Sequence, residues 1–171
     1  MAKKFRITNQ KALDLKTMID LLDPQKTLDA CGTNDVRSLK NVLKATDEIA
    51  DSIKDFTDLR QQVIDALEEE RRPFQKEMDD NMLSSDDEDL KKRKEGEIGR
   101  RAVKVLTEKD REISERLGFA AKKEEEVEVT VGSDDRFELV RKMVEKEGVR
   151  MFKDKRVLVE IVDALDSAEP V

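Results

Sequence analysis

The sequence predicts a mainly α-helical protein with a minor α+β part, in which a long antiparallel helical hairpin is joined to a small head. Three observations support this fold class. Apolar residues recur at three- and four-residue steps over most of the chain, which is the spacing of amphipathic helices. Clear alternation of charged and apolar residues, typical of strands, occurs only near the two ends. The charged fraction of 44% far exceeds the roughly 25% of ordinary globular domains, as expected of long, exposed helices.

The first part of the predicted head spans residues 1–33. "KKFRIT" alternates charged residues with Phe5 and Ile7, which predicts a short strand. A helix follows, and its apolar face consists of Leu15, Met18, Ile19 and Leu22. Pro24 ends this helix, because proline disfavours helical geometry in the preceding residue. We expect a linker around Gly32 to complete this part of the head.

The predicted hairpin spans residues 34–117. Its first helix is expected to run without a break from residue 35 to 72, where Pro73 kinks or restarts it. The apolar seam consists of Leu39, Val42, Ile49, Ile53, Phe56, Val63, Leu67 and Phe74, and it is interrupted at Thr46, Arg60 and Glu70. Flanking apolar residues widen the seam, so this helix is expected to contact more than one neighbour.

The acidic segment "DDNMLSSDDED" predicts the turn of the hairpin. Ser85 and Glu88 have the spacing of a capping box, which marks the start of the second helix. That helix is expected to reach Leu117, where Gly118 ends it. Gly99 lies near its apolar edge, so we interpret this glycine as a place where a facing helix packs closely.

The second part of the predicted head spans residues 118–171. "EEEVEVTVG" alternates acids with Val127, Val129 and Val131, which is the clearest strand pattern of the chain. Pairing this strand with the one around Phe5 would bring both ends of the hairpin to one small head.

The remainder of the chain predicts two short helices. The first is expected to end at Gly148, and "VRMF" at 149–152 is a possible third strand. Asp154 is the expected cap of the last helix.

The composition excludes most enzyme classes. The chain has no His and one Cys, so it lacks an imidazole base, a Cys-His nucleophile and a thiolate zinc site. No glycine-rich phosphate loop occurs. We therefore expect no catalytic residue, cofactor or metal. No apolar run has membrane-spanning length and no signal-peptide core is visible, which predicts a protein of a virion or of the host cytoplasm.

The most basic stretch of the chain is "KKRKEGEIGRR", residues 91–101. Its positive charges belong to Lys91, Lys92, Arg93, Lys94, Arg100 and Arg101. Most of them lie opposite the apolar stripe of the helix, and several follow an acid by four residues, as in Glu88 with Lys92 and Glu97 with Arg101. The net charge is −7. A solvated helix face is the main interpretation, and a nucleic-acid site using these residues is the alternative.

The order of elements resembles a loose group of small, uncharacterised phage-encoded proteins. The residues that carry the resemblance are the charged hairpin, "EEEVEVTV" and the closing "VLVEIVDALD", over roughly residues 36–165. The resemblance implies a virion component or an assembly factor.

These observations favour a non-enzymatic structural or assembly protein whose partners are copies of itself and other protein subunits. A hairpin with more apolar surface than it can cover is suited to symmetric self-association. Leu43, Leu59 and Val103 are the candidates for that uncovered surface. Besides nucleic-acid binding, a cytosolic chaperone or adaptor with a helical arm is an alternative, and it would associate transiently rather than stoichiometrically.

Overall fold

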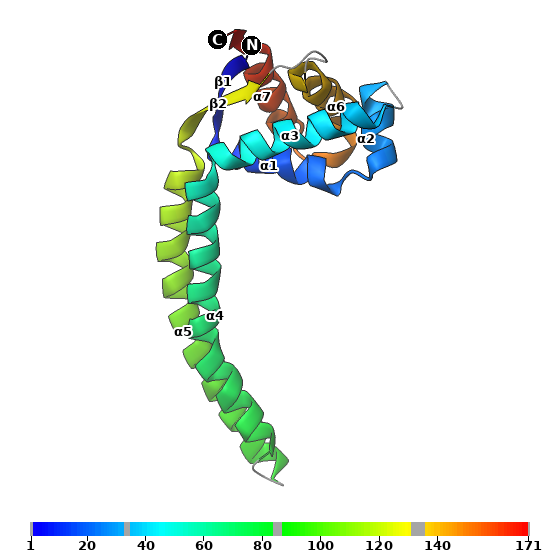
Figure 1. The fold of residues 1–171 in the computed structure, drawn as a ribbon. Helices are drawn as coiled ribbons and strands as arrows, with labels where there is room; N and C mark the ends of the chain where they lie inside the picture. The colour runs from blue at the N-terminus through cyan, green and yellow to red at the C-terminus, as the bar shows by residue number, and fades with distance from the viewer. Residues whose placement is uncertain (1, 33–34, 84–86, 131–135, 171) are drawn as a thin grey trace. The chain divides into compact units, whose positions relative to one another are not determined.

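The structure is a computed structural model that describes residues 2–32, 35–83, 87–130 and 136–170. It confirms the predicted fold class, because these residues form seven helices and one small three-stranded antiparallel sheet (Figure 1). In chain order the elements are β1 (Ala2–Thr8), α1 (Asn9–Leu21), α2 (Pro24–Cys31), α3 (Val36–Ser52), α4 (Lys54–Leu83), α5 (Glu88–Ala121), β2 (Glu124–Thr130), α6 (Arg136–Met151), α7 (Lys155–Asp166) and β3 (Glu169–Pro170).

The chain divides into two compact units. The head unit comprises Met1–Lys54 and Ala121–Val171, and the hairpin unit comprises Asp55–Ala120. The boundary predicted at residue 34 is therefore corrected, because α3 packs against α1, α6 and β2 of the head unit. The single helix expected up to residue 72 is also wrong. Helical geometry is interrupted at Ile53, where φ is −110° and ψ is 18°, so α3 and α4 are separate helices.

The sheet joins segments that are far apart in the sequence. Its strand order is β2-β1-β3, with both pairs antiparallel. Phe5 lies opposite Val127, which confirms the predicted pairing of these two strands. On its other edge β1 pairs with β3, where Lys4 lies opposite Glu169. Val131, which was expected in the strand, lies outside the described residues.

The two faces of the sheet differ in polarity, as the alternation predicts. The buried face consists of Phe5, Ile7, Val127 and Val129. On the other face Lys4 Nζ lies 3.2 Å from Glu126 Oε1 and 3.7 Å from a carboxylate oxygen of Glu128. The hydrogen bond to Glu126 and its charge raise the pKa of Lys4. Both partners are solvent-exposed, so this pair adds little to stability.

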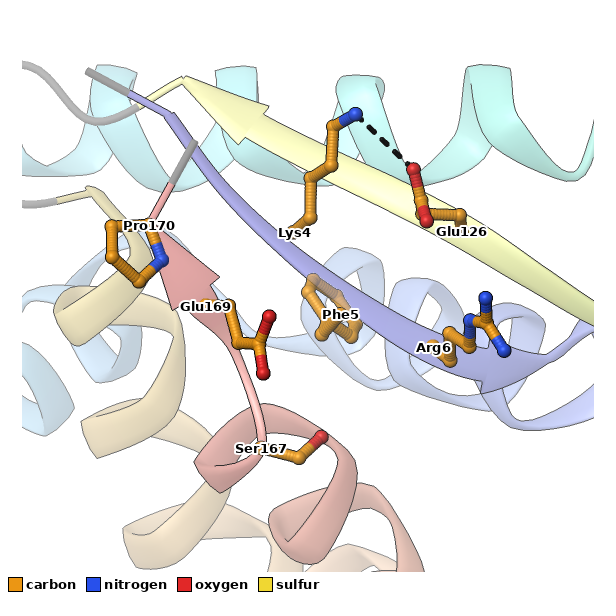
Figure 2. Close-up of a pocket in the computed structure, with 7 residues that line it drawn as sticks. All are labelled: Lys4, Phe5, Arg6, Glu126, Ser167, Glu169 and Pro170. Atoms are coloured by element: carbon orange, nitrogen blue, oxygen red, sulfur yellow. Dashed lines mark ion pairs between the residues drawn. The ribbon is translucent and has the colours of Figure 1, made fainter.

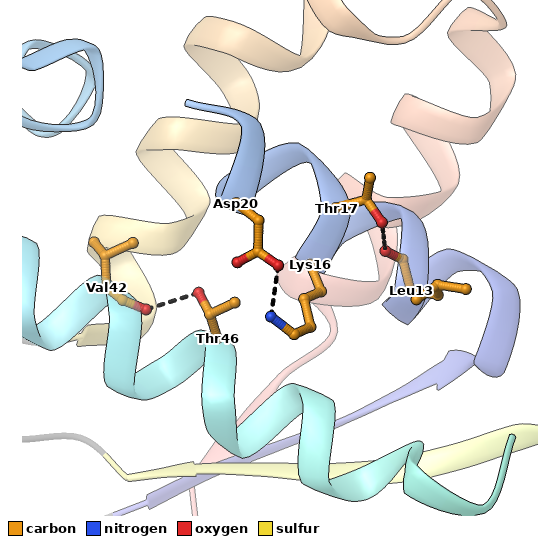
Figure 3. Close-up of polar contacts among 6 residues, drawn as sticks. All are labelled: Leu13, Lys16, Thr17, Asp20, Val42 and Thr46. Atoms are coloured by element: carbon orange, nitrogen blue, oxygen red, sulfur yellow. Dashed lines mark hydrogen bonds and ion pairs between the residues drawn. The ribbon is translucent and has the colours of Figure 1, made fainter. Parts of the chain in front are cut away.

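Helices α1, α3, α6 and α7 share one apolar core with the buried face of the sheet. Fully buried side chains in this core include Leu15, Ile49, Met143, Ile161 and Leu165. Thr46 interrupts the apolar pattern of α3 and is nevertheless buried, because its hydroxyl donates a 2.8 Å hydrogen bond to the Val42 carbonyl (Figure 3). The same figure shows the equivalent bond in α1, from Thr17 to the carbonyl of Leu13. A buried hydroxyl satisfied within its own helix needs no polar partner in the core.

The segment predicted as a linker contains the helix α2. Pro24 occupies its first turn, where the missing N–H removes no helical hydrogen bond. Asp23 caps the helix by accepting a 2.9 Å hydrogen bond from the backbone N–H of Lys26. That bond lowers the pKa of Asp23, so the contribution of the cap is present above the ordinary pKa and is lost as the pH falls. Gly32 follows in the left-handed conformation, with φ of 70°.

Gly148 does not end its helix, and residues 149–152 are not a strand. α6 continues through Gly148 to Met151. A Cβ at Gly148 would lie 2.4 Å from Leu158 Cδ1 of α7 and 3.5 Å from Phe152 Cδ2. A side chain at position 148 would therefore require the Leu158 side chain of α7 to shift, and the glycine has no role as a helix stop.

Replacing Gly148 by alanine is expected to destabilise the protein by about 1–2 kcal/mol, because overpacking against Leu158 outweighs the gain in helix propensity. Gly96→Ala is the matched control, since nothing lies within 4 Å of a Cβ at that helical glycine. It should stabilise by up to about 1 kcal/mol. Urea unfolding followed by circular dichroism measures both. A stabilising Gly148→Ala would show that the approach of α7 does not constrain this position.

In the hairpin unit α4 and α5 lie side by side (Figure 1). The side-chain amide of Asn81 donates a 3.2 Å hydrogen bond to the backbone carbonyl of Lys91. Farther from the turn, Glu77 forms an ion pair with Arg101. The partners become more distant in sequence with distance from the turn, which is the pattern of two antiparallel helices.

Three expectations for the hairpin concern its breaks and caps. Pro73 does not end α4, which continues to Leu83. Gly118 does not end α5, which continues to Ala121. Ser85 of the proposed capping box lies outside the described residues. The backbone N–H of Leu90 instead donates to the carboxylate of Asp87, at 3.2 Å, which supports the start of α5.

Candidate functional site

An apolar groove runs between α4 and α5 on one side of the hairpin unit. Its lining residues are Ile64, Leu67, Glu68, Arg71, Gly99, Ala102, Val103, Leu106, Thr107 and Asp110. Ile64 is 43% exposed and Val103 is 66% exposed, so apolar surface on both walls is open to solvent. We call this feature the hairpin groove.

Helical spacing explains why these residues share one surface. On α4 the lining positions stand zero, three, four and seven residues from Ile64, and on α5 the lining positions continue the same pattern from Gly99 to Asp110. Each helix therefore contributes one face. The half-buried floor consists of Leu67, Ala102 and Leu106. An apolar floor of this kind is suited to bind an apolar protein surface.

Charges of both signs stand at the rim of the hairpin groove. Glu68 and Arg71 lie on α4, and Asp110 lies on α5. All three are exposed, and none forms an ion pair or side-chain hydrogen bond within the described ranges of the chain. Because α4 and α5 are antiparallel, Arg71 and Asp110 stand toward opposite ends of the groove. These charges are available to a partner.

Gly99 lines the groove but is not closely packed within the chain. Among the residues that the structure describes, nothing lies within 4 Å of a Cβ built at this position. The expectation that a facing helix of the same chain approaches Gly99 is therefore wrong. A glycine inside a helix costs about 1 kcal/mol relative to alanine, and no contact with the described part of the chain accounts for that cost here.

The three predicted interface residues have different surroundings. Val103 forms part of the α5 wall of the groove. Leu59 is half-buried in α4 and does not line the groove. Leu43 is 47% exposed and belongs to α3 of the head unit. Of the three, Val103 alone belongs to the groove.

On the α4 side of this site, the sequence analysis identifies Leu67 alone, as part of the apolar seam. Ile64, Glu68 and Arg71 were not selected, although their spacing of four and three residues places them on one helix face. The available signal was this combination of an exposed apolar residue with two charges of opposite sign on the same face.

The basic residues of α5 are placed differently from the predicted pairing. Arg101 pairs with Glu77 across the hairpin rather than with Glu97, and Lys91 lies 3.9 Å from Glu88. Within the part of the chain that the structure describes, no ion pair involves the exposed side chains of Lys92, Arg93, Lys94 and Arg100. Arg100 Nε donates instead to the carbonyl of Gly96, at 3.1 Å. These positive charges face solvent.

A second hollow adjoins the sheet of the head unit (Figure 2). Lys4 and Arg6 of β1, Glu126 of β2, and Ser167 and Glu169 near the C-terminal strand contribute to its lining. Lys4 is already paired with Glu126. The lining is polar and partly neutralised, so it offers a partner less unpaired surface than the hairpin groove does.

Comparison of this chain with protein-family models, with curated proteins and with solved structures finds no match. Among the described helices, none combines the length and the apolar character that crossing a membrane requires.

Proposed function

We propose that this protein is a non-enzymatic structural or assembly protein that acts through protein–protein contacts and associates with itself through the hairpin groove. The observation that carries the proposal is the groove itself, with an apolar floor, an exposed Val103 and unpaired charges of both signs at its rim. Covering such a surface with a second copy removes apolar area from water and gives the rim charges partners.

The composition supports a role in binding rather than in chemistry. The chain has no histidine, and its one cysteine cannot form an intrachain disulfide. We further propose that the protein is a component of a phage particle. This proposal depends on the resemblance of its order of elements to that of phage-encoded proteins. Mass spectrometry of purified particles tests that placement separately from self-association.

We expect size-exclusion chromatography with light scattering to give a discrete mass of two or more whole chains. The physical reason is that a closed symmetric contact buries the groove once and leaves no open surface for further growth. Concentration should be read by refractive index, because the chain has no Trp and no Tyr. A stable monomer at all concentrations would overturn the proposed self-association.

Nucleic-acid binding is the second candidate, favoured by the solvent-facing Lys92, Arg93, Lys94 and Arg100. Absorbance at 260 nm in the same experiment distinguishes it, since the protein itself absorbs little there. A co-eluting signal that salt removes, and that is lost when these four residues are replaced by glutamine, would support this candidate. A discrete oligomer without that signal supports assembly.

A further inference from the structure

We infer, on the basis of the proposed self-association, that a second copy of this chain covers the hairpin groove in the antiparallel orientation. In this arrangement the two-fold axis lies across the helices between Glu68 and Arg71, and Glu68 of each copy faces Arg71 of the other. The contact pairs α4 with α4 and α5 with α5.

The spacing of Glu68 and Arg71 favours this orientation. Glu68 and Arg71 are three residues apart on the same face of α4, so about 4.5 Å separates them along the helix axis. Both follow Leu67 of the apolar floor and line the same groove. A two-fold contact uses the same surface on both copies. An axis across the helices reverses their direction, so it places each charge opposite the other and forms two equal ion pairs.

The alternative two-fold axis runs along the helices and is less favourable. It places α4 of one copy opposite α5 of the other, at the same level along the groove. Glu68 then faces the region of Thr107, and Arg71 faces the region of Val103. This arrangement leaves both charges beside uncharged residues at the contact, where unpaired charge is unfavourable.

The two ends of the groove support the antiparallel orientation. Arg71 and Gly99 are at the end near the turn, whereas Ile64 and Asp110 are at the other end. Reversal places the end of one copy that holds Gly99 over the end of the other copy that holds Asp110, with α5 facing α5. On the α5 wall Gly99 and Ala102 have small side chains, so a facing helix can approach their backbone. Such an approach accounts for a helical glycine that no contact within the described ranges explains.

Charge exchange tests the orientation. In sedimentation equilibrium of the full chain, Glu68→Arg and Arg71→Glu should each weaken association at least about tenfold, because each puts like charges face to face. The double variant restores both pairs with reversed signs, so its dissociation constant should return to within about threefold of wild type. Circular dichroism at 222 nm confirms that the helices are retained.

The neighbouring face of α4 supplies the matched control. Glu69 and Arg72 have the same spacing and charges and are exposed, but neither lines the groove. Glu69→Arg and Arg72→Glu should leave the dissociation constant within about twofold of wild type.

The outcomes separate the two proposals. A monomeric wild-type chain overturns self-association and the orientation together. An oligomer that responds to none of the changes at Glu68 and Arg71 overturns the inferred contact and leaves self-association in place. Single variants that weaken association without rescue by the double variant overturn the antiparallel orientation alone. Loss in both single variants with rescue supports it.

Discussion

Replacing Phe137 by alanine is expected to destabilise the protein by about 3–5 kcal/mol, the largest stability effect that we predict for a single side chain. Phe137 is 3% exposed and lies at the start of α6, within the head core. Truncation removes the apolar area of the ring from the core and leaves a cavity. The sheet lies on one side of this cavity and prevents its collapse.

Specific geometry adds to this burial. The ring of Phe137 meets that of Phe5 edge to face, with centroids 5.8 Å apart at an angle of 64°. The ammonium of Lys3 lies 4.7 Å from the centroid of the Phe137 ring. Aromatic pairs of this kind contribute about 0.5–1.5 kcal/mol beyond area burial. The side chain therefore links α6 to β1.

Urea unfolding followed by circular dichroism measures the effect, with Phe119→Ala as the control. Phe119 is 87% exposed, so its removal should change the free energy of unfolding by less than about 0.5 kcal/mol. Equal effects of the two replacements would contradict the assigned core. A Leu replacement at Phe137 should retain part of the lost stability, because it refills much of the cavity.

Sequence patterns correctly predicted the two long strands of the head and the cap of its last helix. The alternation around Phe5 and Val127 was sufficient to predict two strands and their pairing. The expected cap at Asp154 is confirmed, since its carboxylate accepts a 2.9 Å hydrogen bond from the N–H of Arg156. The cap depends on residues within a few positions of each other. The pairing of the strands depends on the one face of the sheet that is buried.

The errors occurred where tertiary packing opposes a local signal. Gly148 was expected to end a helix, but it is a contact position whose partner, Leu158, lies ten residues later. α4 runs through Pro73, so the helix does not restart there, and the kink at Pro73 stays a prediction. No single-sequence pattern marked the interruption at Ile53, because apolar residues continue at helical spacing on both sides.

The candidate site was only partly predictable for a related reason. An exposed apolar residue such as Val103 could be chosen from one helix alone. The groove depends on which faces of α4 and α5 meet, and that is set by contacts such as Glu77 with Arg101 across the hairpin. Sequence periodicity defines a face of each helix, but it does not define the register between two helices.

Val103→Asp is expected to weaken self-association by at least about 100-fold, the largest effect on binding that we predict. Val103 is 66% exposed in the free chain, so an aspartate there is hydrated and leaves the monomer folded. Covering the groove removes that hydration. In the inferred contact no basic residue of the second copy lies directly opposite, so the charge is buried without a partner.

Val105→Asp on the same helix is the control that makes this result interpretable. Val105 is 39% exposed and does not line the groove, because two residues of an α-helix turn it to nearly the opposite side. Both variants exchange the same residue types inside α5, so the change in helix propensity is shared. Sedimentation equilibrium that shows loss for Val103→Asp alone would locate the interface on the groove side of α5. Equal losses would mean that the helix is destabilised as a whole, and equal retention would mean that the copies meet on another surface.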